Sequence, residues 1–136
     1  YLSCTPQEAF NKISRLDFVA SINPNSGLNT TIVFQNSRII RYILEVENVG
    51  KWESERLLIP EENMIVTQRR SPLSPFKYMI VLHIFKEHIQ GTQLTYIEEF
   101  EVDEENIKKE EKIFSDITNK IKPNLKKIEA YFNTNK

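Results

Sequence analysis

Glycine, cysteine and histidine are scarce in this chain of 136 residues, which contains three, one and two of them. Three separated glycines cannot form a glycine-rich phosphate loop. One cysteine excludes an internal disulfide, and one cysteine with two histidines, at no ligand spacing, argue against a zinc site. We therefore expect no cofactor, and the lone cysteine favours a reducing, cytoplasmic location.

Long apolar runs and strong net charge are also missing. No stretch approaches the roughly 20 apolar residues that a membrane-spanning helix needs. The net charge of −1 gives no global field that would attract nucleic acid or an anionic membrane. The composition is that of an ordinary globular protein, and the length suits one domain, residues 1–136. The chain starts abruptly at Tyr1, and the sequence does not show whether residues before Tyr1 complete the first strand.

Periodicity divides the chain into three regions. Helical spacing and the Thr5-Pro6-Gln7-Glu8 start signal predict a helix from residue 6, and a second short helix is expected over 17–22. Period two then predicts strands near residues 30–36, 38–47, 51–59, 63–70, 77–87 and 92–102. Residues 1–4 resemble the end of one more strand. After Asp103, an apolar stripe predicts a helix of about 30 residues, kinked at Pro123.

This order predicts an α+β domain, with a curved antiparallel sheet of about seven strands wrapped around a long C-terminal helix. Two short helices follow the first strand. The sheet must bury its apolar face, and the terminal helix is the only element long enough to cover it. A twisted sheet around one helix closes imperfectly, so we expect a cavity between them.

Charged residues mark the solvent face of several strands and so indicate which side chains line the cavity. Tyr42, Trp52, Ser54 and Arg56 are predicted to point inward, as are the following residues of the last strand: Tyr96, Glu98 and Phe100. The strand 77–87 is apolar on both faces, one of which carries Met79, His83 and Phe85. In the strand 63–70, either Gln68 or Arg69 is a candidate for the inward position.

An inward cation needs an explanation, because an unpaired buried charge is costly. In one interpretation, Arg56 and Glu98 pair with each other in a structural ion pair, or the charged end of either side chain extends to the rim of the cavity. In the other they are polar groups in a small-molecule cavity. For His83 alone, a core histidine is the better interpretation, and a Cys4–His83 nucleophile and base pair has no further support.

Two segments resemble a known family. The stretch "VGKWESERLLIPEENMIVTQRRSPLSPFKYM", followed by "GTQLTYIEEFEV", is similar to the polyketide cyclase/aromatase group of the START/Bet v 1-like (SRPBCC) superfamily, which has the helix-grip fold. The shared features are the Trp-x-Ser-x-Arg strand, the Pro-Phe-x-x-Met segment and the Gly-Thr hairpin that ends in Glu-Phe. At two positions, His83 and Glu98 replace the tryptophan and histidine that members of the group carry.

The resemblance implies an enzyme that folds a poly-β-keto or related hydrophobic, oxygen-rich chain for intramolecular aldol cyclisation and dehydration. It assigns Arg56 to carbonyl or enolate oxygens, and Glu98 or His83 to proton transfer. The candidate substrate-binding residues are Tyr42, Trp52, Ser54, Gln68, Met79, Phe85, Tyr96 and Phe100.

The candidate partners are the small molecule, an acyl carrier protein docking on a basic patch of Arg69, Arg70 and Lys77, and a second copy of the chain in a homodimer. Two other functions stay open. One is non-enzymatic binding or transport of a hydrophobic molecule such as a lipid or quinone. The other is a partner-binding module of the kind that assists chaperones.

Overall fold

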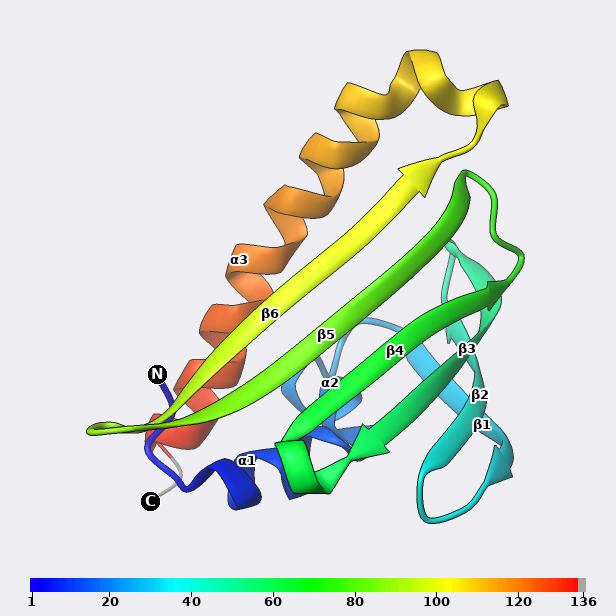
Figure 1. The fold of residues 1–136 in the computed structure, drawn as a ribbon. Helices are drawn as coiled ribbons and strands as arrows, with labels where there is room; N and C mark the ends of the chain where they lie inside the picture. Colours follow the sequence, from blue (N-terminus) through cyan, green and yellow to red (C-terminus); the bar gives the residue numbers. More distant parts are fainter. Residues whose placement is uncertain (135–136) are drawn as a thin grey trace.

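One six-stranded antiparallel sheet, in the spatial order β1-β2-β3-β4-β5-β6, forms the body of the protein (Figure 1). The computed structural model describes residues 1–134. The strands are β1 Leu28–Gln35, β2 Ile39–Val46, β3 Gly50–Ile59, β4 Met64–Ser71, β5 Phe76–His88 and β6 Gly91–Val102. The predicted antiparallel meander is therefore confirmed, with strand ends within two residues of those expected.

The seventh strand expected at residues 1–4 is reduced to a single bridge. The Leu2 N–H donates to the Thr92 carbonyl at 2.8 Å, and the Thr92 N–H donates back at 2.9 Å. The chain turns away immediately because Thr5 caps the helix α1, Pro6–Ile13. The Glu8 N–H donates to the Thr5 hydroxyl and the Thr5 N–H donates to the Glu8 carboxylate, as the capping-box pattern predicts.

Four further helical elements occur in the described residues. Helix α2, Asp17–Ile22, follows α1 as predicted, and the short 3-10 helix η1, Pro60–Glu62, connects β3 to β4. The expected terminal helix is divided into a 3-10 helix η2, Glu104–Lys109, and a helix α3, Glu110–Thr134. Asp103 caps η2 by accepting from the Asn106 N–H, and Pro123 lies at an exposed position inside α3.

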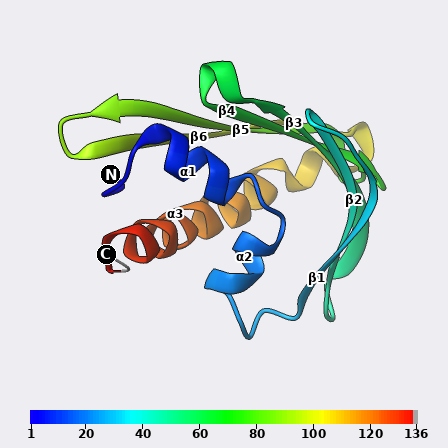
Figure 2. The ribbon, with the colours of Figure 1, turned by 90° about the horizontal axis from the view of Figure 1, so that it is seen from below.

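The sheet curls around α3. Figure 2 shows β1 and β2 bending away from the plane of β4, β5 and β6, with α3 on the concave side and α1 and α2 at one end. This is the helix-grip arrangement. None of the described helices is long and apolar enough to cross a membrane.

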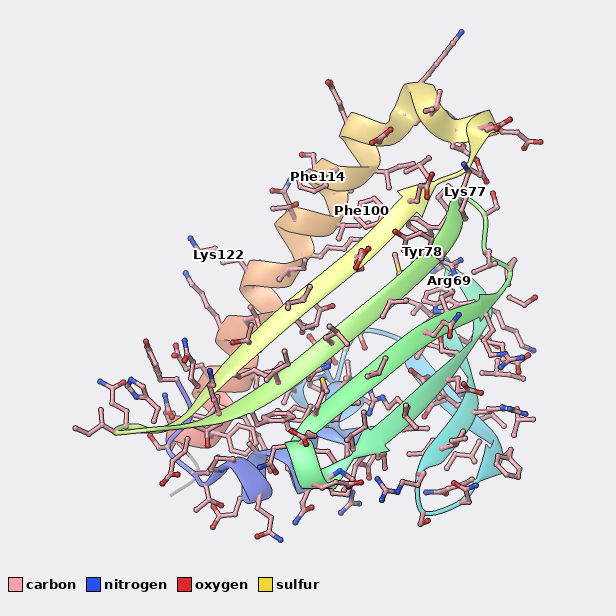
Figure 3. The ribbon with its side chains drawn as sticks, in the orientation of Figure 1. Arg69, Lys77, Tyr78, Phe100, Phe114 and Lys122 are labelled. Atoms are coloured by element: carbon pink, nitrogen blue, oxygen red, sulfur yellow. The ribbon has the colours of Figure 1, made fainter. Side chains whose placement is uncertain are left out.

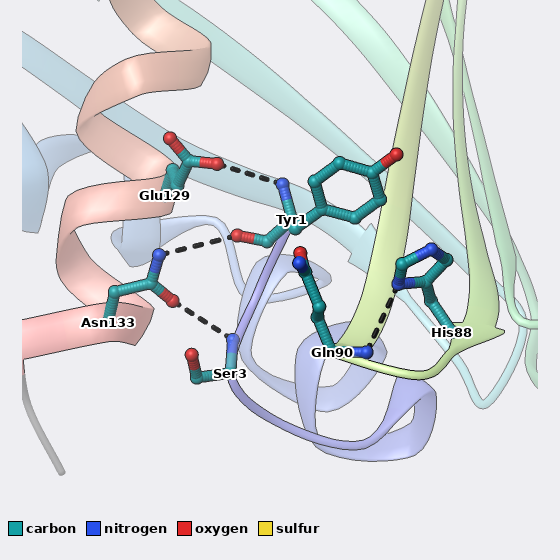
Figure 4. A network of polar contacts seen from close by, with 6 residues as sticks. All are labelled: Tyr1, Ser3, His88, Gln90, Glu129 and Asn133. Carbon is teal, nitrogen blue, oxygen red and sulfur yellow. Dashed lines mark hydrogen bonds and ion pairs between the residues drawn. The ribbon is translucent and has the colours of Figure 1, made fainter.

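The packed core occupies the end of the molecule where α1, α2 and the last turns of α3 meet the sheet. Its members are Leu2, Ala9, Phe10, Ile13, Phe18, Ile65, Phe85 and Ile128. Polar contacts between the start of the chain and α3 close the same end (Figure 4): the Tyr1 amino group lies 2.8 Å from Glu129 Oε2, and the Ser3 N–H donates to Asn133 Oδ1 at 3.0 Å. Among residues 1–134, the buried core cluster does not extend to the opposite half of the concave face.

Candidate functional site

A cavity of about 610 Å³ lies between the concave face of the sheet and the middle turns of α3. Each long strand contributes one end to the core and the other to this cavity, because α1 and α2 cover only part of the concave face. The lining residues are Tyr42, Leu44, Val49, Gly50, Lys51, Trp52, Ser54, Thr67, Arg69, Pro72, Phe76, Met79, Val81, Tyr96, Glu98, Ile117, Lys120, Ile121 and Asn124. The predicted hollow between sheet and helix is present.

Six predicted site residues line this cavity directly: Tyr42, Trp52, Ser54, Met79, Tyr96 and Glu98. Alternation along β2, β3 and β6 places five of them inward, as the charged residues on the opposite face indicated, whereas Met79 lies on β5, whose two apolar faces gave no such signal. Tyr42 and Ser54 are cross-strand partners and are both buried, so the β2–β3 wall of the cavity is rigid and carries two hydroxyl groups.

Glu98 and Tyr96 form a hydrogen-bonded pair on the β6 wall. The Tyr96 hydroxyl donates to Glu98 Oε2 at 2.9 Å, and both side chains line the cavity. Burial raises the pKa of the Glu98 carboxyl, and the Tyr96 hydrogen bond offsets part of that rise. Burial and the neighbouring carboxylate raise the pKa of Tyr96, so its hydroxyl keeps its proton. The pair therefore offers one carboxyl that exchanges a proton and one hydroxyl that orients it.

Arg56 points inward, as predicted, and is 8% exposed. The ion pair with Glu98 that one interpretation proposed is not formed. Arg56 Nη1 instead donates to the carbonyls of Ile13 and Ser14 at 3.1 and 2.9 Å, at the C-terminal end of α1. A cation at that position satisfies two helix carbonyls and complements the negative end of the helix dipole. The arginine thus joins the sheet to α1, behind the cavity wall.

Three buried polar atoms without a hydrogen-bond partner in the described residues occur around Arg56: its own Nε, Thr67 Oγ1 and His83 Nδ1. Thr67 is the cross-strand partner of both Arg56 and Val81, and His83 follows Val81 by two residues on the same face of β5. Thr67 lines the cavity. Thr67 therefore brings one unpartnered hydroxyl to the cavity lining, whereas Arg56 Nε and His83 Nδ1 belong to residues behind that lining.

His83 lies deeper than predicted for a proton carrier. Burial, with a smaller contribution from the Arg56 charge, lowers its pKa to about 3, so the imidazole is neutral at physiological pH. Its ring packs edge-on to Tyr96, with the ring centroids 5.1 Å apart. The burial agrees with a core position for His83, but the hydrogen bonding expected of a core histidine is incomplete, because Nδ1 has no partner among the described residues. Burial also raises the pKa of the Cys4 thiol, which disfavours the thiolate that a cysteine nucleophile needs.

The choice of Gln68 as a site residue needs correction. Gln68 is exposed on the outer face of β4, and Arg69 takes the inward position and lines the cavity. The alternation of β4 was ambiguous because both of its faces carry apolar residues. Ile65 and Thr67 share the inward face with Arg69, and Met64, Val66 and Gln68 lie on the other.

Two further predicted residues lie outside the main cavity. Phe85 belongs to the packed core, where it meets Phe10 edge-on at a centroid distance of 6.2 Å. Phe100 lines an adjoining hollow of about 850 Å³ between β6 and the region of η2 and the start of α3, together with Phe114, which is 60% exposed (Figure 3). Glu98 lines both spaces, so the two adjoin at its side chain.

The basic patch proposed for a carrier protein is also corrected. Arg69 points inward and is removed from it. Arg70 Nη1 lies 3.0 Å from Glu55 Oε2, and Lys77 Nζ lies 3.2 Å from Glu101 Oε1. The remaining two cations are therefore balanced by carboxylates at the surface.

Several lining residues were missed by sequence analysis. Leu44, Thr67, Phe76, Val81, Ile117, Lys120, Ile121 and Asn124 belong to this group. Leu44 shares the inward face of β2 with Tyr42, and Ile117 and Ile121 belong to the apolar stripe of the terminal helix, so the sequence carries a signal for these three positions. The other assignments depend on where α3 crosses the sheet. Among residues 1–134, no cluster of three His, Cys, Asp or Glu residues is placed to hold a metal ion.

Solved structures with this fold are found at low sequence identity. TTHA0849 from Thermus thermophilus matches with a TM-score of 0.77 and 12% identity, over 98% of this chain and 92% of that one. The Zhui aromatase/cyclase from Streptomyces sp. R1128 matches with a TM-score of 0.65 and 17% identity, over 75% of this chain. The di-domain ARO/CYC StfQ, from the steffimycin biosynthetic pathway, matches with a TM-score of 0.81 and 9% identity, over 98% of this chain.

The matched regions span 64% of the Zhui chain and 49% of the StfQ chain. No family model matches the sequence, and the search of curated proteins finds no match. At these identities the similarity demonstrates the shared helix-grip fold, and the chemistry must be argued from the residues of this chain.

Proposed function

We propose that this protein binds a hydrophobic, oxygen-rich small molecule in the cavity and promotes its intramolecular aldol cyclisation and dehydration. The observation that carries the proposal is a protonatable carboxyl, Glu98, held by Tyr96 in the wall of a largely apolar cavity. The aromatase/cyclases with the same fold support the choice of reaction class.

The cavity would contribute mainly by confining a flexible chain. Effective molarities from well-oriented intramolecular reactions correspond to roughly 7–11 kcal/mol in favourable cases. Leu44, Met79 and Val81 supply an apolar surface on the sheet side, and Ile117 and Ile121 supply one on the helix side. A poly-β-keto chain folded between these walls brings a methylene close to a carbonyl carbon.

The proton transfers are assigned to Glu98. Its carboxylate removes a proton from a methylene that lies between two carbonyls. The resulting enolate carbon attacks the ketone carbon and forms the new C–C bond. The alkoxide then takes the proton back from Glu98, and loss of water gives the unsaturated ring. General acid–base help of this kind is typically worth about 10²–10⁴-fold in rate.

Polar groups at the inner end would stabilise oxygen-centred charge. Thr67 lines the cavity beside Arg56, whose Nε is free of a protein partner within residues 1–134. Nη1 is held by two carbonyls behind the cavity wall, so the guanidinium is fixed in position and acts on the cavity through its positive charge. His83 takes no direct part in the proposed chemistry, since it lies outside the cavity lining and its low pKa prevents it from holding a proton near neutral pH.

The test uses 2,4,6,8-nonanetetraone, a neutral tetraketone whose aldol ring closure and loss of one water give 2,4-dihydroxy-6-methylacetophenone. Product is measured by liquid chromatography with mass detection, with and without protein. We expect faster product formation with protein, and a loss of about 10²-fold or more in Glu98→Gln. Glu99→Gln is the matched control, because Glu99 is exposed on the outer face, where it accepts from Tyr78. Equal rates in Glu98→Gln and the original protein would remove Glu98 from the mechanism.

Non-enzymatic binding of a hydrophobic molecule is the second candidate. The engagement of Arg56 by the carbonyls of α1 favours it, because that contact gives the inward cation a structural purpose. In a carrier, Glu98→Gln changes ligand affinity and no turnover exists to be lost. Native mass spectrometry of the protein from its own host distinguishes the candidates, since a carrier retains its ligand and an enzyme releases the cyclised product.

A further inference from the structure

Arg69 is the most enclosed of the three cationic side chains that line the cavity. Arg69 is partly buried, whereas Lys51 and Lys120 are exposed. Its guanidinium carbon lies 4.9 Å from the centre of the Trp52 ring and 5.6 Å from that of Phe76. Figure 3 shows it near the end of β4 that leads into the loop of residues 72–75, which contains two prolines. Two aromatic contacts hold the planar group in one orientation.

One edge of this guanidinium is free. Arg69 Nε donates to the Pro72 carbonyl at 2.9 Å, and within residues 1–134 that is its hydrogen bond to protein. Arg15, Arg38, Arg41 and Arg70 each pair with a carboxylate. The Nη1 and Nη2 groups of Arg69 therefore remain available on the cavity side. Burial lowers the pKa of Arg69 from the ordinary arginine value, because the charged guanidinium loses part of its hydration at this position.

The residues that line the cavity carry an excess of positive charge. The lining contains Arg69, Lys51 and Lys120 against one carboxyl, Glu98. A partly buried cation beside aromatic rings, with no carboxylate paired to it among the described residues, is stabilised by an anionic partner. A planar guanidinium that presents two nitrogens on one edge matches the two oxygens of a carboxylate.

We infer that the ligand of this cavity carries a carboxylate, which Arg69 binds through Nη1 and Nη2 while the apolar body lies between the sheet and α3. The inference rests on the proposed small-molecule function and specifies the substrate class: an amphipathic monocarboxylic acid that arrives free. A substrate tethered through its acyl group to a carrier protein has no carboxylate to offer. Trp52 and Phe76 are positioning residues for the guanidinium.

The experiment compares matched acid and amide pairs. The probes are 2-naphthoate with 2-naphthamide and anthracene-9-carboxylate with anthracene-9-carboxamide, titrated by fluorescence and by calorimetry. We expect the acids to bind at least about tenfold more tightly than the amides, because a charged hydrogen-bonded pair adds to the apolar contact. Arg69→Gln is expected to abolish the difference. Arg70→Gln is the matched control, since the neighbouring side chain is exposed and paired with Glu55 on the outer face.

Three results are distinguishable. Preference for the acids that disappears only in Arg69→Gln supports the inference. Equal binding of acids and amides that is lost in the cavity-filling variants Val81→Trp or Ile121→Trp overturns the carboxylate assignment and leaves the small-molecule cavity standing. Failure of every acid and amide to bind, in protein shown by circular dichroism to be folded, overturns both the inference and the proposed function. Val81→Trp fills the cavity from the sheet and Ile121→Trp fills it from α3, so the test remains possible if one of the two variants does not fold.

Discussion

Replacing Arg56 by methionine tests whether the inward arginine stabilises the fold through the end of α1. The change keeps an unbranched apolar stem against Tyr42, whose ring centre lies 5.8 Å from the guanidinium carbon. It removes both hydrogen bonds to the carbonyls of Ile13 and Ser14. It leaves the Ile13 carbonyl buried, because α1 packs against the sheet there.

The magnitude follows from opposing terms. Hydrogen bonds to charged groups are worth about 1.5–3 kcal/mol each, and the cation also complements the helix dipole. Removing a buried guanidinium whose Nε lacks a partner within residues 1–134 recovers part of its desolvation cost. We expect a net loss of about 2–4 kcal/mol in the free energy of unfolding.

Urea denaturation followed by Trp52 fluorescence measures this loss. With a slope of about 2 kcal/mol per molar urea, the midpoint should fall by about 1–2 M. Arg70→Met is the control, because an exposed ion pair is worth about 0–1 kcal/mol. If Arg56→Met is as stable as the original protein, desolvation cancels the contacts and the arginine does not secure α1.

Three further predictions concern stability. The pKa of His83 is lowered to about 3 in the fold, so unfolding takes up a proton below the ordinary value of 6.5 and stability falls as pH drops through that window. The loss attributable to this ring at pH 5 is about 2 kcal/mol, measured as the difference in pH dependence between the original protein and His83→Leu; parallel curves would refute it. Gly91→Ala should cost about 2–4 kcal/mol, because its Cβ would lie 2.4 Å from the Leu2 carbonyl oxygen at a φ of +122°. Gly50 also has a positive φ, but an added Cβ would lie at an ordinary contact distance of 3.9 Å from the Trp52 ring, so Gly50→Ala should cost clearly less. Equal losses of stability for the two variants in thermal unfolding would contradict the steric reason. Thr5→Ala removes the capping hydroxyl of α1 and should cost about 1 kcal/mol in urea, with no change expected if the cap is dispensable.

Much of the fold could be predicted because its signals are local. The period-two pattern of residues 28–102 and the capping pattern at Thr5 depend on neighbours a few positions apart. The inward positions of Tyr42, Ser54 and Glu98 followed, because charged residues on the opposite face marked the solvent side of each strand. β4 lacked that contrast, so Gln68 and Arg69 could not be separated from alternation alone.

The amino-acid sequence by itself determined the order of helices and strands, the antiparallel pairing of neighbours and the inward direction of Arg56, since short turns and alternation specify each of these locally. Only the tertiary structure decided that Arg56 meets the end of α1 while Arg69 faces the cavity. It also decided which half of the concave face is filled. Those outcomes depend on where α1 and α3 cross the sheet, which is a balance of packing among residues far apart in the chain.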